Sequence, residues 1–358
     1  MSLDQALAQI RPDVLAAQAY AVQPSTGFVK LDVMENPYRL SPELQQALGQ
    51  RLGAVAINRY PAERTADLAA ALKRHAGLPE SCGITLGNGS DELISLLTLA
   101  VSKPGAVILS PLPSFVMYEM SARHQHLRFV GVPLRAEDFE LDEAAMLAAI
   151  AEHQPALIYL SYPNNPTGNL WDAAAIERIV AAAPGLVVMD EAYQPFAIGD
   201  SLALMARHPH VLVMRTMSKF GLAGVRIGYL CGAAELVEQV EKLRPPFNVS
   251  VLNAEAALFA LEHADVYAAQ AAELRQQRER VFSVLQALPG VTPWPSQGNM
   301  ILARVQDAAA TFAVLKARGV LIKNVSAMHP LLANCLRITI GTPDENTRLL
   351  AELPSCLS

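Results

Sequence analysis

Lys219 has the clearest chemical potential of the side chains in this 358-residue sequence. It follows the hydroxyl residues Thr216 and Ser218 and precedes a glycine-rich apolar segment, and Arg226 lies seven residues further on. A lysine in such a setting loses its proton more easily than a solvated lysine and can attack a carbonyl carbon to form a Schiff base. A lone lysine is most often a surface charge, but surface lysines are seldom framed by hydroxyl groups and an arginine. The segment therefore indicates a reactive lysine.

Two further polar motifs directly follow apolar runs. Asp190 ends the run 185–189 and Tyr193 follows three residues later, whereas Asn165 lies in the segment SYPNNPTG (161–168). The carboxylate of Asp190 could bind a metal, act as a base or pair with a cationic heterocycle. No second acid or histidine at ligand spacing supports a metal, so we expect no metal site. The prolines around Asn165 would hold its amide rigidly, although the same residue types are common in simple turns.

Two segments could bind anions. The segment GNGSDE (87–92) leads into the helical run 93–101, and the start of a helix attracts anions such as phosphate. It lacks the third glycine of a dinucleotide-binding fingerprint, and Ser90 or Asp91 could equally serve only as a helix cap. Arg337 lies among apolar β residues, where burial would require an anionic partner, either a protein carboxylate or a substrate anion.

These motifs lie where predicted strands end. Short β-branched runs alternate with alanine-rich helical stretches, which is the pattern of a largely parallel sheet with helical crossovers. The strands are predicted over 106–109, 127–132, 156–160, 186–189, 211–214 and 226–230, and helices over 91–101, 141–151 and 172–183. Ligands of open α/β sheets bind at the carboxyl ends of the strands, so motifs that are distant in sequence predict one shared site.

The pattern of the chain changes after 244–248. The predicted elements are then a long helix over 252–288, a strand over 300–304, a helix over 308–318, strands over 320–323 and 336–340, and a helix over 345–353. We therefore predict an N-terminal arm over 1–45, a large α/β domain over 46–255 and a small α+β domain over 256–358.

Composition excludes several classes of protein. The chain is 52% hydrophobic with a net charge of −6 and has no run of like charges, which argues against a broad nucleic-acid surface. Its apolar runs stay below the roughly 18 residues of a membrane span, and the acidic N-terminus does not resemble a signal peptide. Four cysteines without CxxC spacing favour reduced thiols in the cytoplasm. We expect no nucleic-acid partner and no membrane association.

Taken together and in this order, the motifs resemble the pyridoxal-phosphate-dependent aminotransferases of fold type I, and within them the histidinol-phosphate aminotransferase family. The resemblance covers nearly the whole chain. It is carried by LDVMENPY (31–38), NRYP (58–61), GNGSDELI (87–94), NNPTG (164–168), DEAY (190–193), SK (218–219) and LRITIGT (336–342). It implies an α/β fold in which helices sandwich a mostly parallel sheet in a large domain, followed by a smaller α+β C-terminal domain.

The resemblance implies pyridoxal 5′-phosphate as the cofactor. Lys219 would bind its aldehyde and move the substrate proton, and Asp190 would pair with the pyridinium nitrogen. Tyr193 and Asn165 would form hydrogen bonds with its phenolic oxygen. The remaining residues implied to contact the cofactor are Ser90, Asp91, Thr216, Ser218 and Arg226 at its phosphate, Phe115 at its ring face, and Tyr60 from the partner subunit of a homodimer.

The implied reaction converts L-histidinol phosphate and 2-oxoglutarate to imidazole-acetol phosphate and L-glutamate in histidine biosynthesis. Arg337 would bind the anionic end of both substrates, and Tyr20, Asn36 and Tyr38 belong to an arm that covers them. Lys323 stands where many members of the family have an arginine, which keeps the charge but loses the bidentate geometry.

Three alternative functions share these motifs. Arg337 could bind the carboxylate of an aromatic amino acid, as in an aromatic amino-acid aminotransferase. A threonine-phosphate decarboxylase-like lyase has the same scaffold but breaks the bond between Cα and the carboxylate. A non-catalytic, cofactor-binding regulator is disfavoured, because Lys219 and Asp190 are both retained and no DNA-binding segment is appended.

Overall fold

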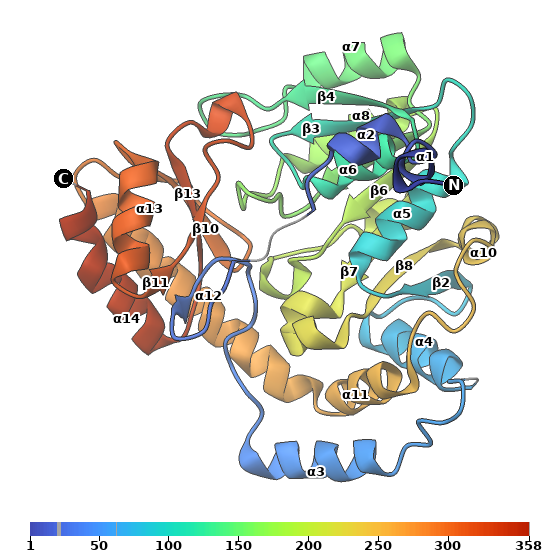
Figure 1. The fold of residues 1–358 in the computed structure, drawn as a ribbon, viewed down its shortest axis with the longest axis horizontal. Coiled ribbons are helices and arrows are strands. Elements are labelled where there is room, and N and C mark those ends of the chain that lie inside the picture. Colours follow the sequence, from blue (N-terminus) through green and yellow to red (C-terminus); the bar gives the residue numbers. More distant parts are fainter. Residues whose placement is uncertain (20–22, 62, 358) are drawn as a thin grey trace.

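A seven-stranded sheet forms the centre of the fold in the computed structural model, which describes residues 1–19, 23–61 and 63–357 (Figure 1). Its strand order is β2–β8–β7–β6–β5–β3–β4. The strands are β2 (Cys82–Gly87), β3 (Val107–Leu112), β4 (Arg128–Pro133), β5 (Leu157–Ser161), β6 (Leu186–Asp190), β7 (Val211–Thr216) and β8 (Gly228–Ala233). β8 runs antiparallel to β2 and β7, whereas the other neighbours are parallel. The prediction of a mostly parallel sheet is therefore confirmed.

The predicted strands correspond to β3 through β8, with ends that differ by up to three residues. β2 was not predicted, because Gly83 and Gly87 interrupt its pattern and glycine is disfavoured in strands. The structure explains Gly83: a Cβ there would lie 2.8 Å from the Cα of Ala234, the first residue of a helix (Ala234–Glu241) that packs against β2.

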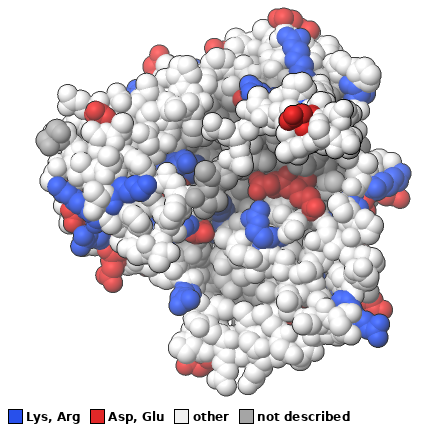
Figure 2. All heavy atoms as spheres, viewed as in Figure 1, with Lys and Arg blue, Asp and Glu red and all other residues white. Residues whose placement is uncertain are grey.

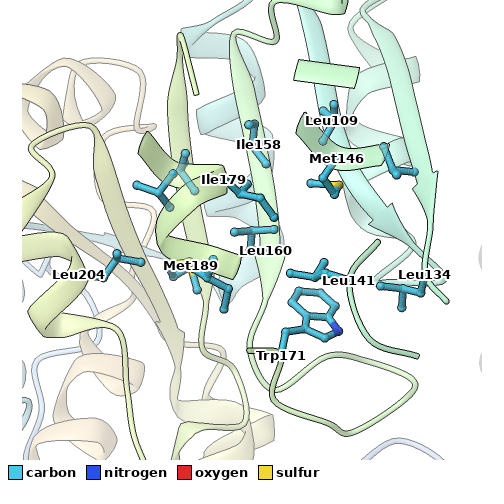
Figure 3. Packing of buried hydrophobic residues seen from close by; sticks show 14 of the residues in the cluster. Leu109, Leu134, Leu141, Met146, Ile158, Leu160, Trp171, Ile179, Met189 and Leu204 are labelled. Carbon is cyan, nitrogen blue, oxygen red and sulfur yellow. The ribbon is translucent and has the colours of Figure 1, made fainter. Parts of the chain in front are cut away.

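Helices cover both faces of the sheet, because successive side chains of a strand point to opposite faces. Ile158 and Leu160 of β5 face one layer, and Leu157 and Tyr159 face the other. The first layer, whose core is shown in Figure 3, consists of α7 (Glu143–His153), α8 (Ala173–Ala182) and α9 (Leu202–Arg207). The second layer consists of α5 (Ser90–Ala100), α6 (Met117–His124) and α10 (Ala234–Glu241).

The long helix predicted over 252–288 is two helices. The backbone of His263 leaves the helical conformation (φ −115°, ψ 34°) and separates α11 (Val251–Glu262) from α12 (Ala264–Ala287). α11 packs on α4 (Arg64–His75) in the same buried cluster as Leu68 and Leu72. We propose the division into an arm, a large domain and a small domain for the structure as well, with all of α11 in the large domain rather than a boundary at residue 255.

A second sheet, antiparallel throughout, has the order β12–β13–β10–β9. Its strands are β9 (Thr292–Pro293), β10 (Met300–Arg304), β12 (Lys323–Asn324) and β13 (Cys335–Thr339), and α12, α13 (Ala308–Ala317) and α14 (Pro343–Glu352) complete its core. The single strand predicted over 320–323 is wrong. Its first half is β11 (Val320–Leu321), which pairs with β1 (Val29–Lys30), whereas β12 pairs with β13, so the two halves have different partners.

The N-terminal segment contacts both parts of the molecule. The N–H of Leu31 donates to the carbonyl of Leu321 (2.7 Å), and its carbonyl accepts from the N–H of Thr339 (3.0 Å). Of the preceding helices α1 (Leu3–Leu7) and α2 (Pro12–Ala16), α2 is tied to α6 by Arg11, whose Nη1 donates to the carbonyl of His124 (2.7 Å). α3 (Pro42–Gly53) lies beyond α11 at the edge of the molecule and buries none of its residues (Figure 1). Within the described ranges, every helix falls short of the length and apolar character that a membrane span requires.

Candidate active site

A cavity of about 330 Å³ lies at the carboxyl ends of β5, β6 and β7. Apart from Tyr60, all the predicted cofactor residues line it: Ser90, Asp91, Phe115, Asn165, Asp190, Tyr193, Thr216, Ser218, Lys219 and Arg226. Figure 2 shows that the molecule is hollowed near the centre of the displayed face, where acidic and basic side chains gather. A larger hollow of about 750 Å³ lies at the opposite edge of the sheet, and none of the predicted site residues lines it.

Asp190 is the last residue of β6 and is only 3% exposed. Its Oδ2 accepts a hydrogen bond from the hydroxyl of Tyr118 (2.7 Å), and its Oδ1 accepts one from the N–H of Ala192 (3.1 Å). Burial raises the pKa of Asp190 to about 6, although both hydrogen bonds act to lower it. A buried carboxylate of this kind is strongly stabilised by a cationic partner.

Lys219 lies in the short helical turn Ser218–Leu222 that follows β7. It is half-buried and lines the cavity, and its Nζ donates to the carbonyl of Val33 (2.9 Å). Burial, and next the positive charge of Arg337, lower the pKa of Lys219 to about 8. An amine with this pKa is partly unprotonated near neutral pH, as a nucleophile or a base must be.

The start of α5 lies open at the cavity. The N-cap residue is Gly89 (φ +84°) and no side chain caps the helix, so the alternative in which Ser90 or Asp91 serves only as a cap is wrong. The carboxylate of Asp91 instead accepts a hydrogen bond from Nη2 of Arg226 (3.2 Å). A Cβ at Gly89 would lie 2.5 Å from the same nitrogen. The positive φ therefore favours glycine here, and any larger residue would also displace the guanidinium of Arg226.

Hydroxyl groups complete this region. Nη1 of Arg226 donates to Oγ of Ser218 (3.3 Å), and the hydroxyl oxygens of Ser218 and Thr216 lie 3.0 Å apart. We call the start of α5 together with Thr216, Ser218 and Arg226 the anion cup. A helix N-terminus, a guanidinium and hydroxyl donors are the groups that bind phosphate.

Arg337 of β13 contacts Asn165, one of the residues that line the cavity. Its Nη1 donates to Oδ1 of Asn165 (2.7 Å), and its Nη2 donates to the carbonyl of Asp32 (2.8 Å). Arg337, Asn165 and Tyr193 are each less than a tenth exposed, and burial raises the pKa of the Tyr193 hydroxyl. Arg337 is not itself part of the cavity lining, which already contains Lys219 and Arg226, and it is joined to the cavity through Asn165.

Neither Asn36 nor Tyr38 lines the cavity, although residues 33–35 of the same arm do. Tyr20 lies outside the described residues. The amide nitrogen of Asn36 donates to the carbonyl of Phe220 (3.2 Å) and to Gln270 (3.0 Å), and its oxygen accepts from the N–H of Tyr38 (2.9 Å). Tyr38 packs against the core of the small domain. These contacts tie the arm to the turn that carries the reactive lysine and to α12.

Lys323 and Tyr60 also lie outside the cavity lining. Lys323 is the cross-strand partner of Arg337, so the two side chains share one face of the sheet. Tyr60 is 75% exposed, and its ring stacks on Phe247 with centroids 4.4 Å apart.

Sequence reasoning missed Tyr118, whose hydroxyl contacts Asp190. Tyr118 is fully buried, stacks on Tyr159 (centroids 4.4 Å apart) and meets Phe115 edge to face (5.7 Å). The sequence did contain one signal: Tyr118 follows Phe115 by three residues, and side chains three residues apart on a helix point to the same side.

A buried ion pair was missed as well. Nε of Arg215 donates to Oε2 of Glu191 (2.8 Å), and both residues are less than a tenth exposed. The pair joins the ends of β6 and β7, one residue from Asp190 and from Thr216. It therefore fixes the spacing of two strand ends that carry site residues.

This fold and this cavity are those of an aminotransferase: the family model for aminotransferase class I and II matches residues 26–353, and the chain belongs to that family. Within it, the chain is highly similar to several histidinol-phosphate aminotransferases. The one from Methylibium petroleiphilum is 65% identical over 98% of this chain and 95% of its own length, and the one from Paracidovorax citrulli is 60% identical over 99% of both. The chain is thus a member of the histidinol-phosphate aminotransferase family.

Solved structures agree with this placement. The histidinol-phosphate aminotransferase from Sinorhizobium meliloti, solved in complex with pyridoxal-5′-phosphate, superposes with a TM-score of 0.85 at 26% identity and covers 98% of this chain and 97% of its own. An L-threonine-O-3-phosphate decarboxylase from Porphyromonas gingivalis shares the fold, with a TM-score of 0.76 at 22% identity over 91% of this chain and 98% of its own.

Proposed function

We propose that the protein is a pyridoxal-phosphate-dependent aminotransferase that converts L-histidinol phosphate and 2-oxoglutarate to imidazole-acetol phosphate and L-glutamate, a step of histidine biosynthesis. The observation that carries the proposal is the placement of Lys219, Asp190 and the anion cup around one cavity. The high identity to histidinol-phosphate aminotransferases over nearly the full length supports the choice of substrate.

The residues of the cavity fit pyridoxal 5′-phosphate. Asp190 is a buried carboxylate suited to a cationic ring nitrogen, and the anion cup suits the phosphate. Tyr193 and Asn165 would bind the phenolic oxygen, and Phe115 would cover the ring face. When bound, the cofactor supplies an aldehyde that takes up the substrate amino group and a ring that accepts the electrons released at the substrate carbon.

Lys219 would hold the aldehyde and move the proton. Its Nζ, with a pKa lowered to about 8, can accept the proton from the substrate carbon that bears the amino group. Burial of Asp190 and its hydrogen bond from Tyr118 keep its carboxylate aimed at one point in the cavity. The protein would thereby hold in place both the amine that moves the proton, Lys219, and the carboxylate that pairs with the cofactor ring, Asp190.

Arg337 and Lys323 would bind the anionic end of the substrate. Their side chains share one face of the small sheet, and Arg337 is anchored beside the cavity by Asn165. A guanidinium and an ammonium side by side suit the phosphate of histidinol phosphate and the carboxylates of 2-oxoglutarate. An aromatic amino acid would offer this pair only a singly charged carboxylate, whereas a phosphate monoester carries a charge of about −1.5 to −2 near neutral pH.

The functional unit would be a homodimer in which Tyr60 contacts the cofactor phosphate of the partner subunit. Tyr60 is 75% exposed, and its neighbours Ile57 (73%) and Phe247 (50%) are exposed apolar residues as well. An exposed apolar group of this kind is typical of a surface that another chain covers.

The four cysteines are free thiols, which supports a reducing, cytoplasmic location.

A single half-reaction tests the substrate. Histidinol phosphate is added without a keto acid to the purified protein loaded with cofactor, and the absorbance of the aldehyde form should convert stoichiometrically to that of the aminated form. Phenylalanine and threonine phosphate serve as comparisons, with carbon dioxide release measured for the latter. Conversion by phenylalanine or decarboxylation of threonine phosphate, with histidinol phosphate inert, would refute the assignment. A Lys219→Ala variant should lose multiple turnover.

A further inference from the structure

The loop that carries Tyr60 buries almost none of its described residues. This segment, which we call the Tyr60 loop, comprises the described residues 54–61 and 63 between α3 and α4. Pro61 is its only buried member among them, and α3 before it buries no residue. Apolar burial therefore cannot fix the position of the loop, and other contacts must do so.

Two arginines bracket the loop and share one carboxylate. Arg51 is in the last turn of α3 and Arg64 is the first residue of α4. Arg64 donates from Nε to Oε2 of Glu255 (2.8 Å) and from Nη2 to Oε1 (2.9 Å), and Nε of Arg51 donates to Oε1. Glu255 belongs to α11, so both ends of the loop are bonded to the same point of the large domain.

Glu255 differs from the other acids of this network in its burial. Its side chain is 6% exposed, whereas Glu262, which accepts from Nη1 of Arg51, is 57% exposed, and Asp67, which accepts from Arg64, is 53% exposed. Burial raises the pKa of Glu255, but the hydrogen bonds from the two arginines outweigh it and leave the pKa lowered, so the group is ionised at neutral pH. Ion pairs of the exposed acids are screened by solvent, and the pairs of Glu255 are screened less.

Tyr60 faces the same part of the surface. The loop, both arginines and Glu255 line one hollow of about 520 Å³, and the Tyr60 ring stacks on Phe247 with an interplanar angle of 18°. The loop is thus held at both ends by Glu255 and at Tyr60 by a ring contact, and the Tyr60 side chain remains exposed.

We propose that Glu255 is a positioning residue for cofactor binding in the partner subunit: it clamps both ends of the Tyr60 loop so that the Tyr60 hydroxyl is presented in the geometry that the partner's cofactor phosphate requires. The inference rests on the proposed function, in which Tyr60 crosses a dimer interface. Glu255 itself touches neither cofactor nor substrate, and acts through Tyr60.

The test measures the dissociation constant for pyridoxal 5′-phosphate of the dimeric apoprotein, with the dimer verified by sedimentation. Tyr60→Phe should weaken binding roughly tenfold or more, because it removes one hydrogen bond to a charged group. Glu255→Gln should weaken binding by roughly fivefold to tenfold, no more than Tyr60→Phe does, because it acts through the same hydroxyl. Glu262→Gln is the matched control, since it removes the exposed partner of Arg51, and should change binding less than about twofold.

The double variant Glu255→Gln/Tyr60→Phe decides the mechanism, because a clamp that acts through Tyr60 adds nothing once the hydroxyl is gone. Additive effects, or wild-type affinity in Glu255→Gln, would overturn the clamp while leaving the proposed function intact. Wild-type affinity in Tyr60→Phe would overturn the interfacial role of Tyr60 and the clamp with it. If Glu255→Gln does not fold, Arg51→Gln takes its place and must weaken binding more than Glu262→Gln does.

Discussion

Replacing Tyr118 with phenylalanine removes one hydroxyl from a fully buried site and leaves the ring in place. That hydroxyl donates to Oδ2 of Asp190 at 2.7 Å and favours the ionised carboxylate. A hydrogen bond to a charged group contributes about 1.5–3 kcal/mol, and one pKa unit corresponds to about 1.4 kcal/mol. Because the bond stabilises the charged form, its loss should raise the pKa of Asp190 from about 6 to roughly 7–8.

The consequence is a shift in the pH dependence of cofactor binding. A protonated Asp190 cannot pair with the cationic ring nitrogen, so affinity for pyridoxal 5′-phosphate should fall below about pH 6 in the parent and already below roughly pH 7–8 in Tyr118→Phe. The titration is made in a Lys219→Ala background, because the amine has a pKa of about 8 and would titrate in the same range.

Tyr159→Phe is the matched control for this measurement. Tyr159 stacks on Tyr118, but its hydroxyl donates to the carbonyl of Ile94 (3.2 Å) rather than to Asp190. Removal of the Tyr159 hydroxyl should leave the pH profile of cofactor binding unchanged. Superimposable profiles for Tyr118→Phe and the parent would refute the role given to the hydrogen bond.

Three further predictions concern the same cavity. The pKa of Asp190 is raised from 3.8 to about 6, so its contribution to stability is present below about pH 4 and is lost as the pH rises through 6. Asp190→Asn removes the buried charge and should therefore stabilise the apoprotein at pH 8 by up to about 3 kcal/mol. Urea unfolding measures this gain, which should be absent at pH 4. Gly89→Ala should weaken cofactor binding at least tenfold in an equilibrium titration, because its Cβ would displace the Arg226 guanidinium, whose Nη2 lies 2.5 Å away, and because its backbone conformation (φ +84°, ψ 169°) costs other residues about 1–3 kcal/mol. Lys323→Ala should raise KM for histidinol phosphate about tenfold with little change in kcat, whereas Lys323→Arg should keep KM low; a loss confined to kcat would place the lysine elsewhere.

The grouping of the proposed cofactor residues around one cavity could be predicted from the sequence because of the topology of a parallel sheet. Asn165, Asp190 and Thr216 each follow an apolar run, and the carboxyl ends of neighbouring parallel strands meet at one edge. If the apolar runs are strands of one parallel sheet, the side chains at their carboxyl ends must lie close together. The structure brings them to one cavity, as expected.

The parts that could not be predicted depend on contacts between distant segments. The amide of Asn36 bonds Phe220 and Gln270, and nothing local distinguishes this from a substrate contact. The break at His263 lies in a run without glycine or proline, so no helix-stopping residue marks it. The carboxylate of Glu255 that the two arginines share cannot be found from a pattern of helix charges, because the arginines lie 204 and 191 residues earlier.

The junction between the N-terminal segment and β13 has a consequence for how the protein is synthesised. The N–H of Met34 donates to Oγ1 of Thr339, a residue 305 positions later, and the carbonyl of Leu31 bonds the same residue. On the ribosome, residues 29–34 emerge long before their partners exist. The wall of the cavity that Val33 forms, next to the bond from Arg337 to the carbonyl of Asp32, is therefore completed only at the end of translation, after the segments that carry Asp190 and Lys219 have been made.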